Sequence, residues 1–268
     1  MILKQFKGFL ETPPFWKNTQ FGIQQFIFPK IDLQTITPES FSNRIRLGHQ
    51  MEHIFKQLIS QIDSHKILLF NLPIKDHTRT IGEIDFIVQE KSSNAIIHVE
   101  LTYKFYLIDP SISEPIHQLI GPNRKDMFFT KMEKIKNQQF QLLHSPEGIK
   151  ALEEKQINHE NIIHQACYKA QLFAPYQTKN VHIRPLNTAC IIGFWIKFDA
   201  FNTKEFNNYK YYIPYKSEWV ITPHEMVEWK SHLEILMDIN LKMISEIAPM
   251  LWIKKTETLF EKCFVVWW

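Results

Sequence analysis

Glycine is scarce in this chain, with 7 residues among 268. Nucleotide-binding loops of the P-loop and Rossmann kinds need closely spaced glycines, because their backbone must approach a phosphate with no side chain in the way. Neither fingerprint is present, and the sequence also has no Gly-x-Ser-x-Gly elbow. These absences argue against a glycine-rich nucleotide loop and against a serine hydrolase.

Metal-binding cysteine and histidine motifs and long apolar runs are missing as well. The three cysteines, Cys167, Cys190 and Cys263, form no CxxC pair and no zinc spacing, and the 12 histidines include no HExxH. An odd cysteine count without a leader fits a reducing compartment, and the first nine residues have no signal-peptide cleavage site. No apolar run reaches the roughly 18 residues of a membrane span. We expect a cytoplasmic protein with no membrane partner.

Hydrophobic and aromatic residues are plentiful. They make up 44% and 13% of the chain, which is enough for a sizeable core. The net charge of +3 and the pI near 8.6 are compatible with a nucleic-acid partner without being diagnostic. No internal repeat or clear boundary is visible. Residues 1–268 are therefore expected to form a single domain, with a core at about 37–143 and an elaborated C-terminal half at about 144–268.

Two neighbouring segments carry the most informative pattern. Residues 82–88 (GEIDFIV) and 96–107 (IIHVELTYKFYL) alternate between apolar and polar side chains, as strands do. Residues 91–94 (KSSN) form a turn between them, so an antiparallel hairpin is predicted. When the apolar faces pack together, the polar side chains share one face: Glu83, Asp85, His98, Glu100, Thr102 and Lys104.

This face contains the residue types of a divalent-metal and phosphate site. Mg²⁺ binds oxygen ligands and keeps several waters, so one or two carboxylates and a substrate phosphate can complete its coordination. Asp85 and Glu100 are the candidate ligands, and Lys104 can orient a water or neutralise a phosphate. The supporting candidates on the same face are Glu83, His98 and Thr102. The same alternation is typical of a sheet with one solvated face, and that alternative stays open.

A helix and a short strand are predicted before the hairpin. Residues 37–62 have apolar side chains at helical spacing, and Thr37 is suited to cap their first turn. Glu52 lies one step off this apolar stripe. Residues 66–71 are predicted as a strand, while the first segment of the chain is expected to be irregular.

A second helix is predicted after the hairpin, opening at Gly121-Pro122. Its polar residues Lys131 and Gln138 are candidates to reach the site. For most of the lysines on this helix, simple solvation is the competing interpretation. Further along, strands are predicted at 188–198 and 259–268, and a capping box at 222–225 predicts the start of a helix.

Residues 82–86 and 98–107 resemble the signature of an uncharacterised bacterial family, domain-of-unknown-function family eighteen fifty-three. The resemblance runs through most of the chain, with further motifs at residues 46–48, 121–123 and 193–195. That family is grouped with the PD-(D/E)xK nuclease superfamily. The resemblance therefore implies an α/β fold with a restriction-endonuclease-like core, in which a mixed central sheet is flanked by helices, and with C-terminal additions.

Members of that superfamily use two acids to bind metal and a lysine beside them. By resemblance, Asp85 and Glu100 correspond to the two acids, and Lys104 corresponds to the lysine. Glu52 resembles the acid that many members carry on the preceding helix. The superfamily lysine usually lies two positions after the second acid, where this chain has Thr102. Lys104 is displaced by about 7 Å along the strand, a shift that a β-bulge would correct.

The predicted function is a Mg²⁺- or Mn²⁺-dependent nuclease that hydrolyses phosphodiester bonds in DNA. A catalytically inactive nucleic-acid-binding protein of the same fold is one alternative, because the displaced lysine puts catalysis in question. A structural or interaction protein whose polar strand face meets solvent is another. Metal binding that depends on Asp85 and Glu100 separates the first from the other two. Salt-dependent binding to DNA separates the alternatives from each other.

Overall fold

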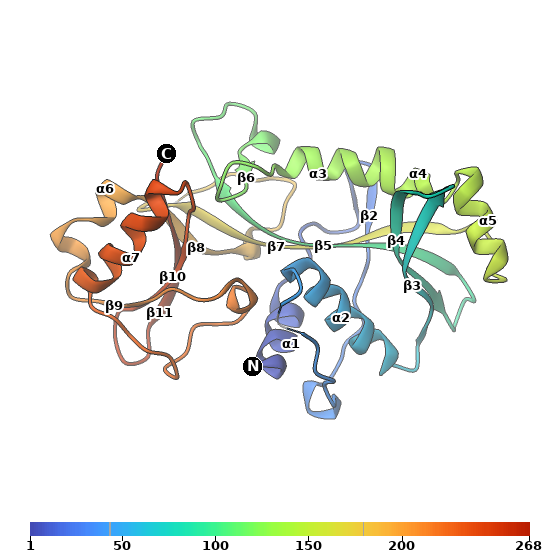
Figure 1. Ribbon diagram of the computed structural model, residues 1–268, viewed down its shortest axis with the longest axis horizontal. Helices are drawn as coiled ribbons and strands as arrows, with labels where there is room; N and C mark the ends of the chain where they lie inside the picture. Colours follow the sequence, from blue (N-terminus) through green and yellow to red (C-terminus); the bar gives the residue numbers. More distant parts are fainter. Residues whose placement is uncertain (43, 179) are drawn as a thin grey trace.

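The computed structural model describes residues 1–42, 44–178 and 180–268 and is a mixed α/β protein. Within these residues, eleven strands join one sheet, with helices on both sides of it (Figure 1). In spatial order its main strands are β3 (His65–Asp76), β4 (Arg79–Glu90), β5 (Ile96–Ile108), β7 (Ile163–Pro175), β8 (Ile191–Lys197), β11 (Phe260–Val266), β10 (Met250–Lys254) and β9 (Lys210–Tyr212). The smaller strands are β1 (Thr19–Gln20), β2 (Ile23–Gln25) and β6 (Leu119–Ile120).

The predicted hairpin is confirmed, and it lies at one end of the sheet. β4 pairs antiparallel with β3 and with β5, and β5 then pairs in parallel with β7 along eleven residue pairs. A parallel neighbour needs a crossover connection. The crossover contains α3 (Phe128–Lys134), a π-helical turn (Ile135–Gln139), α4 (Phe140–Leu142) and α5 (Pro146–Glu154). The remaining helices are α1 (Ile2–Glu11), α2 (Leu47–Ser60), α6 (Phe198–Phe201) and α7 (His232–Ile244).

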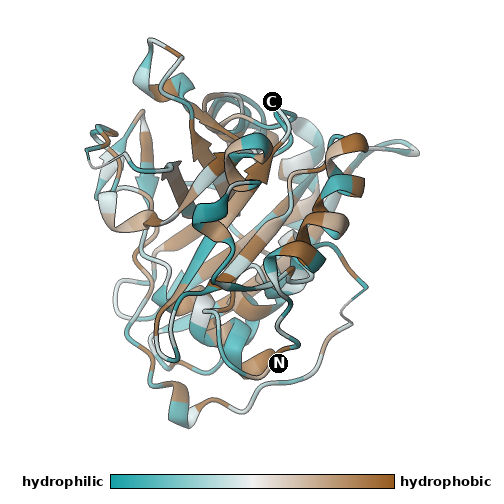
Figure 2. Cartoon of the chain, turned by 90° about the vertical axis from the view of Figure 1, so that its left-hand side faces the viewer, coloured by the Kyte–Doolittle hydropathy of each residue, from teal (hydrophilic) through white to brown (hydrophobic). Residues whose placement is uncertain are grey.

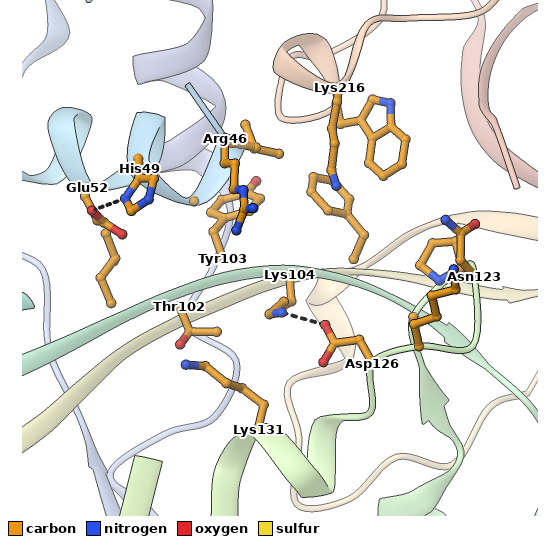
Figure 3. Close-up of a pocket in the computed structure, with 18 residues that line it drawn as sticks. Arg46, His49, Glu52, Thr102, Tyr103, Lys104, Asn123, Asp126, Lys131 and Lys216 are labelled. Carbon is orange, nitrogen blue, oxygen red and sulfur yellow. Dashed lines mark hydrogen bonds and ion pairs between the residues drawn. The ribbon is translucent and has the colours of Figure 1, made fainter. Parts of the chain in front are cut away.

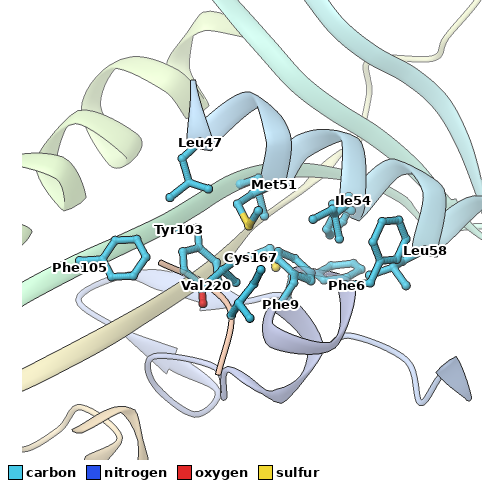
Figure 4. Packing of buried hydrophobic residues seen from close by; sticks show 14 of the residues in the cluster. Phe6, Phe9, Leu47, Met51, Ile54, Leu58, Tyr103, Phe105, Cys167 and Val220 are labelled. Carbon is cyan, nitrogen blue, oxygen red and sulfur yellow. The ribbon is translucent and has the colours of Figure 1, made fainter. Parts of the chain in front are cut away.

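Two hydrophobic clusters cover opposite faces of β5 and β7. α1 and α2 lie on one face, where Phe9 and Met51 pack with Tyr103 (Figure 4). α3 lies on the other face, where Phe128 meets Tyr168 edge to face, with ring centroids 5.6 Å apart. The central strands are correspondingly rich in hydrophobic residues (Figure 2). No helix among the described residues is long and apolar enough to cross a membrane.

The polar face of β5 is buried beneath the crossover helices. His98 and Glu100 have no exposed surface, and Thr102 is 3% exposed. The interpretation of this face as an ordinary solvated surface is therefore wrong. Burial of polar groups without partners costs free energy, so the hydrogen-bond partners of these side chains show how the buried polar face is stabilised.

The helix predicted at 37–62 begins ten residues later, at Leu47. The apolar positions of its second half pack as expected, but residues 37–39 run beside α2 instead of extending it. The side chain of Gln57 bonds both the N–H and the C=O of Glu39, and Gln61 accepts from the N–H of Thr37. These side chains satisfy backbone groups of residues 37–39, so the segment needs no helical turn to do so.

The helix predicted to start at 222–225 was also placed too early. α7 begins at His232, after a capping box formed by Ser231 and Glu234. The residues before it form an irregular segment that ends in a β-bridge, in which Lys230 exchanges two backbone hydrogen bonds with Tyr211 of β9. A long-range strand contact thus outweighs a local capping signal.

The elements missing from the sequence prediction include α1 and β7. The N-terminal segment, expected to be irregular, starts with α1, whose buried residues include Phe6 and Phe9. β7 is the central parallel strand, and nine of its consecutive positions are buried. A strand covered on both faces shows no alternation, which explains why the period of two did not reveal it. The strands predicted near 188–198 and 259–268 are present as β8 and β11.

Candidate functional site

The sheet forks at the two predicted acids. The ladder between β4 and β5 has four residue pairs and stops at Phe86 and Val99. β4 continues along β3, while β5 continues along β7. Asp85 and Glu100 are the next residues on the two strands, so the structure brings them together at the point of divergence. The Oδ2 atom of Asp85 accepts a hydrogen bond of 2.9 Å from the N–H of Leu101.

Both carboxyl groups are held in an unfavourable environment for negative charge. Asp85 is 8% exposed and Glu100 is fully buried. Burial, followed by the charge of Glu100, raises the pKa of Asp85 well above its usual value. Burial also raises the pKa of Glu100, although the ammonium of Lys131 opposes this rise. Carboxyl groups with raised pKa values at one buried position are a candidate functional site, because a bound cation would relieve the repulsion between them.

A chain of three histidines leads from Glu100 towards the surface. The Nε2 atom of His98 lies 3.0 Å from Oε1 of Glu100, and its Nδ1 atom lies 3.0 Å from Nδ1 of His164. The Nε2 atom of His164 lies 2.7 Å from Nε2 of the exposed His144. Burial lowers the pKa of His98 to about 3, so its ring is neutral. A neutral ring that donates from Nε2 to a carboxylate must accept at Nδ1, which fixes the direction of the whole chain.

A π-helical turn brings Gln139 into the site. The amide of Gln139 donates to Oε2 of Glu100 and accepts at Oε1, over 2.9 Å, from the ammonium of Lys131. The predicted candidate Gln138 is exposed instead. Lys131 and Gln138 would share a face in a regular helix, but the π turn at Ile135–Gln139 adds one residue between them. π turns are often found at functional sites, but no feature of the local sequence predicted this one.

The two lysine candidates have different surroundings. Lys104 forms an ion pair of 2.5 Å with Asp126, and both side chains are about one-third exposed. Lys131 is the ammonium whose charge acts on both Asp85 and Glu100. Burial lowers the pKa of Lys131, while the two carboxylates oppose that shift. The structure thus brings Lys131 to the acids and pairs Lys104 elsewhere.

Glu52 lies close to the acids, as the resemblance implied, and Glu83 does not contact them. The Oε2 atom of Glu52 accepts from Asn71 and bonds His49, each over 2.9 Å. The charge of Glu52 contributes to the raised pKa of Asp85. Glu83 is paired with Pro73 across the β3–β4 ladder, and its charge acts on His49.

A pocket of about 550 Å³ opens beside the fork, between the first turn of α2, the edge of β5 and residues 121–126 and 216–219 (Figure 3). Asp85 lies directly behind its lining, because the residue that donates to it, Leu101, is part of the lining. Two acidic residues, Glu52 and Asp126, contribute to the lining. The positively charged side chains outnumber them: Arg46, Lys104, Lys125, Lys131 and Lys216. The site reached through this pocket favours an anionic ligand.

Comparison with family models identifies the relatives of this chain. Residues 30–256 match the model of the family described as Domain of unknown function (DUF1853). The chain belongs to the DUF1853 family. A search of curated proteins and a search of solved structures returned no match. The DUF1853 match spans the fork, the crossover helices and the pocket.

The donor set of this DUF1853 domain can be compared with the needs of different metals. Within residues 1–42, 44–178 and 180–268, no group of three or more His, Cys, Asp or Glu side chains is placed to hold a metal ion. A cage of protein ligands, as zinc or calcium requires, is therefore not available there. Mg²⁺ needs fewer protein ligands, because it takes one or two carboxylates and keeps several waters. The adjacent carboxyl groups of Asp85 and Glu100 fit that requirement, since each oxygen has a second lone pair beyond its hydrogen bond.

Proposed function

We propose that this protein is a metal-dependent nuclease of the PD-(D/E)xK superfamily, with a restriction-endonuclease-like core, which hydrolyses phosphodiester bonds in cytoplasmic DNA. The observation that carries the proposal is the pair Asp85 and Glu100 at the fork of β4 and β5. Both are buried, both have raised pKa values, and they lie behind a pocket in whose lining the arginine and lysine side chains outnumber the acidic ones. Paired acids beside cationic groups suit a substrate that is a phosphodiester.

In this proposal Asp85 and Glu100 would hold Mg²⁺ or Mn²⁺, with Glu52 in support. The ion would supply a water of lowered pKa and would neutralise charge on the phosphate. Gln139 and His98 hold the carboxylate of Glu100 in one orientation through hydrogen bonds to its two oxygens. The hydroxyl of Thr102, which is buried beside the acids, has no partner among the described residues and is free to donate to a phosphate oxygen.

Lys131, and not Lys104, is the ammonium that we assign to the reaction. Its charge acts on both acids, and its hydrogen bond to Gln139 fixes its position. A lysine whose pKa is lowered by burial can hold the attacking water or neutralise charge that develops on the phosphate. Lys104, paired with Asp126, is assigned to the wall of the pocket. This assignment removes the need for a β-bulge between Thr102 and Lys104.

A second candidate function is a nucleic-acid-binding protein of the same fold without catalysis. Both oxygens of Glu100 already accept hydrogen bonds, from His98 and Gln139, which is the arrangement expected if no metal ever binds. The cationic lining of the pocket supports DNA binding equally well in this case. Metal affinity separates the two candidates.

The experiment is a calorimetric titration of Mn²⁺ into the wild type and into Asp85→Asn, followed by incubation of both with labelled single-stranded and plasmid DNA. The nuclease proposal expects binding and cleavage in the wild type and neither in the variant. Asp126→Asn is the matched control, because it changes an acid of the same pocket that is paired with Lys104. The control should keep metal binding.

Two lysine variants test the assignment within the site. Lys131→Met should reduce cleavage by about 10²-fold or more, the usual size of a lost electrostatic contact to a reacting group, and leave DNA binding largely intact. Lys104→Met should reduce cleavage far less. The nuclease proposal fails if Mn²⁺ at millimolar concentration does not bind, or if Asp85→Asn still cleaves. DNA binding without metal binding would establish the second candidate.

A further inference from the structure

α7 carries apolar side chains on two opposite sides. Ile235 and Ile239 are buried in the hydrophobic cluster that covers β10 and β11. The other side of the helix points outward from the end of the molecule (Figure 1) and carries four large apolar side chains that are mostly exposed: Leu233 at 74%, Met237 at 70%, Leu241 at 67% and Ile244 at 74%. A solvated surface helix is normally apolar on one side only, whereas a helix that is apolar on both sides is normally covered on both.

The four exposed side chains form one continuous stripe, which we call the α7 stripe. Its members, Leu233, Met237, Leu241 and Ile244, follow one another at intervals of four, four and three residues, so they share one side of the helix. The stripe is about 17 Å long, at 1.5 Å per residue. Single apolar residues are common on protein surfaces, but a contiguous apolar patch marks a contact surface.

Charged residues follow one border of the α7 stripe. Glu234, Asp238 and Lys242 each come one position after a member of the stripe. Asp238 is neutralised by an ion pair of 2.7 Å with Lys230. In the part of the chain that the structure describes, Glu234 and Lys242 form no ion pair. The border therefore has an unpaired negative charge near the start of the helix and an unpaired positive charge near its end.

This distribution of charge is complementary to itself in one orientation. When a second copy of α7 lies antiparallel on the first, two-fold symmetry brings the same border of both helices together. The register that places Met237 opposite Leu241 of the second copy also places Glu234 opposite Lys242 of the second copy. A parallel arrangement would place Glu234 opposite Glu234 and Lys242 opposite Lys242, which costs free energy through repulsion.

The same border disfavours a lipid surface as the occupant. Helices that lie on membranes carry lysine and arginine along their polar side, because many lipid headgroups are anionic. Here the residues beside the stripe include the acids Glu234 and Asp238, and Asp238 already occupies Lys230. A second copy of the chain, which offers a cation for each unpaired acid, is the better fit.

We propose that the α7 stripe is the interface of a two-fold symmetric dimer, in which α7 of one copy packs antiparallel on α7 of another. The contact is small, because one helix face of about 17 Å supplies less than the roughly 800 Å² per partner of a standard interface. The dimer is accordingly weak, with a Kd in the micromolar range. Its formation does not depend on the nuclease function proposed above.

The test is sedimentation equilibrium of the full chain from about 1 to 300 μM, with EDTA present. The wild type should dimerise, and Leu241→Glu should weaken dimerisation at least about 100-fold, because symmetry places two carboxylates in the apolar contact. Leu241 is exposed and glutamate is a good helix former, so the variant should fold. Ile81→Glu is the matched control. Ile81 is an exposed apolar residue of β4, at the opposite end of the sheet from β9, and its variant should dimerise like the wild type.

Charge variants test the antiparallel orientation. Lys242→Glu should weaken the dimer about fivefold, since it places two acids opposite each other. Glu234→Gln removes the opposing charge, and glutamine can still act in the capping box with Ser231. In the Glu234→Gln background, Lys242→Glu should therefore change the Kd by less than about twofold. Equal effects of Lys242→Glu in the two backgrounds would overturn the antiparallel arrangement.

Two results would overturn the dimer itself. One is a wild type that stays monomeric at about 300 μM, and the other is a dimer that Leu241→Glu leaves unchanged. Co-sedimentation with vesicles of phosphatidylcholine and phosphatidylserine tests the competing occupant. A monomeric wild type that binds these vesicles, with binding lost in Leu241→Glu, would assign the α7 stripe to a lipid surface instead of a second copy.

Discussion

Asp85→Asn should make the protein more stable when no divalent metal is present. The asparagine side chain can still accept the hydrogen bond from Leu101 N–H, and its amide can donate to Glu100. The variant removes a carboxyl group whose pKa is raised by burial and by the charge of Glu100. Repulsion between two buried carboxylates is thereby replaced by a hydrogen bond. A gain in stability from losing a site residue indicates that the site is strained for its function.

The size of the effect follows from the interaction of two charges. At an effective dielectric constant of about 20, unit charges about 4 Å apart repel by about 4 kcal/mol. The two carboxyl groups relieve part of this repulsion by retaining a proton. We therefore expect Asp85→Asn to raise the free energy of unfolding by about 1–3 kcal/mol at pH 8. For a chain of this size, that corresponds to a rise in Tm of about 3–10 °C.

The pH dependence has a definite sign. The folded state holds a proton on Asp85 at pH values where the unfolded chain has released it, because the folded pKa is raised. The wild type therefore loses stability as pH rises from about 4 through the raised pKa. The advantage of Asp85→Asn should accordingly grow with pH and disappear at acidic pH, where the carboxyl group is protonated in both states.

The assay is thermal unfolding with EDTA and with saturating Mn²⁺, across pH 5 to 8. Mn²⁺ at about 100 times its Kd should stabilise the wild type by about 2.7 kcal/mol and the variant by little. Asp126→Asn is the control, since loss of its partly exposed ion pair with Lys104 changes stability by about 1 kcal/mol or less. A fall in Tm of Asp85→Asn in EDTA, or an undiminished response to Mn²⁺, would refute the reasoning.

Buried groups elsewhere in the chain allow three further predictions. Burial lowers the pKa of Lys262 to about 7, so above that pH the folded wild type has released a proton that the unfolded chain still holds. The free energy of unfolding should therefore rise between pH 7 and about 10. Lys262→Met should flatten that rise when unfolding is measured by urea titration. A Cβ atom on Gly8 would lie 2.2 Å from the C=O of Val220, so Gly8→Ala should cost about 1–3 kcal/mol, seen as a lower Tm. The hydroxyl of Ser145 caps α5 at the N–H of Gly148, and Ser145→Ala should cost about 1 kcal/mol by the same measurement.

The hairpin and its acids were predictable because their signal is local. The alternation in residues 82–88 and 96–107 specifies strands, and the turn at 91–94 joins them directly. In an antiparallel hairpin with a short turn, the register follows from the chain itself, so Asp85 and Glu100 had to come close together. The mixed α/β class followed from the same elements and the adjacent helices.

The features of the site that the sequence did not predict depend on contacts between residues that are distant in sequence. Asp126 forms an ion pair with Lys104, which removes that lysine from the acids. His164 of β7 reaches His98 because the two strands pair in parallel, and neither residue carries a motif of its own. Lys216 joins the pocket from a segment more than a hundred residues after β5. Charge pairs and crossovers of this kind depend on the fold as a whole.

The π turn makes the site depend on the number of residues in a helix as well as on their identity. Gln139 reaches Glu100 because one additional residue lies between it and Lys131. Removing a single residue from Ile135–Gln139 would restore the regular helical phase and rotate everything beyond it by about 100°. Glu100 would then lose its amide partner while every side chain of the site kept its chemical identity. Among DUF1853 chains, a one-residue deletion in this helix is thus equivalent to a substitution in the site itself.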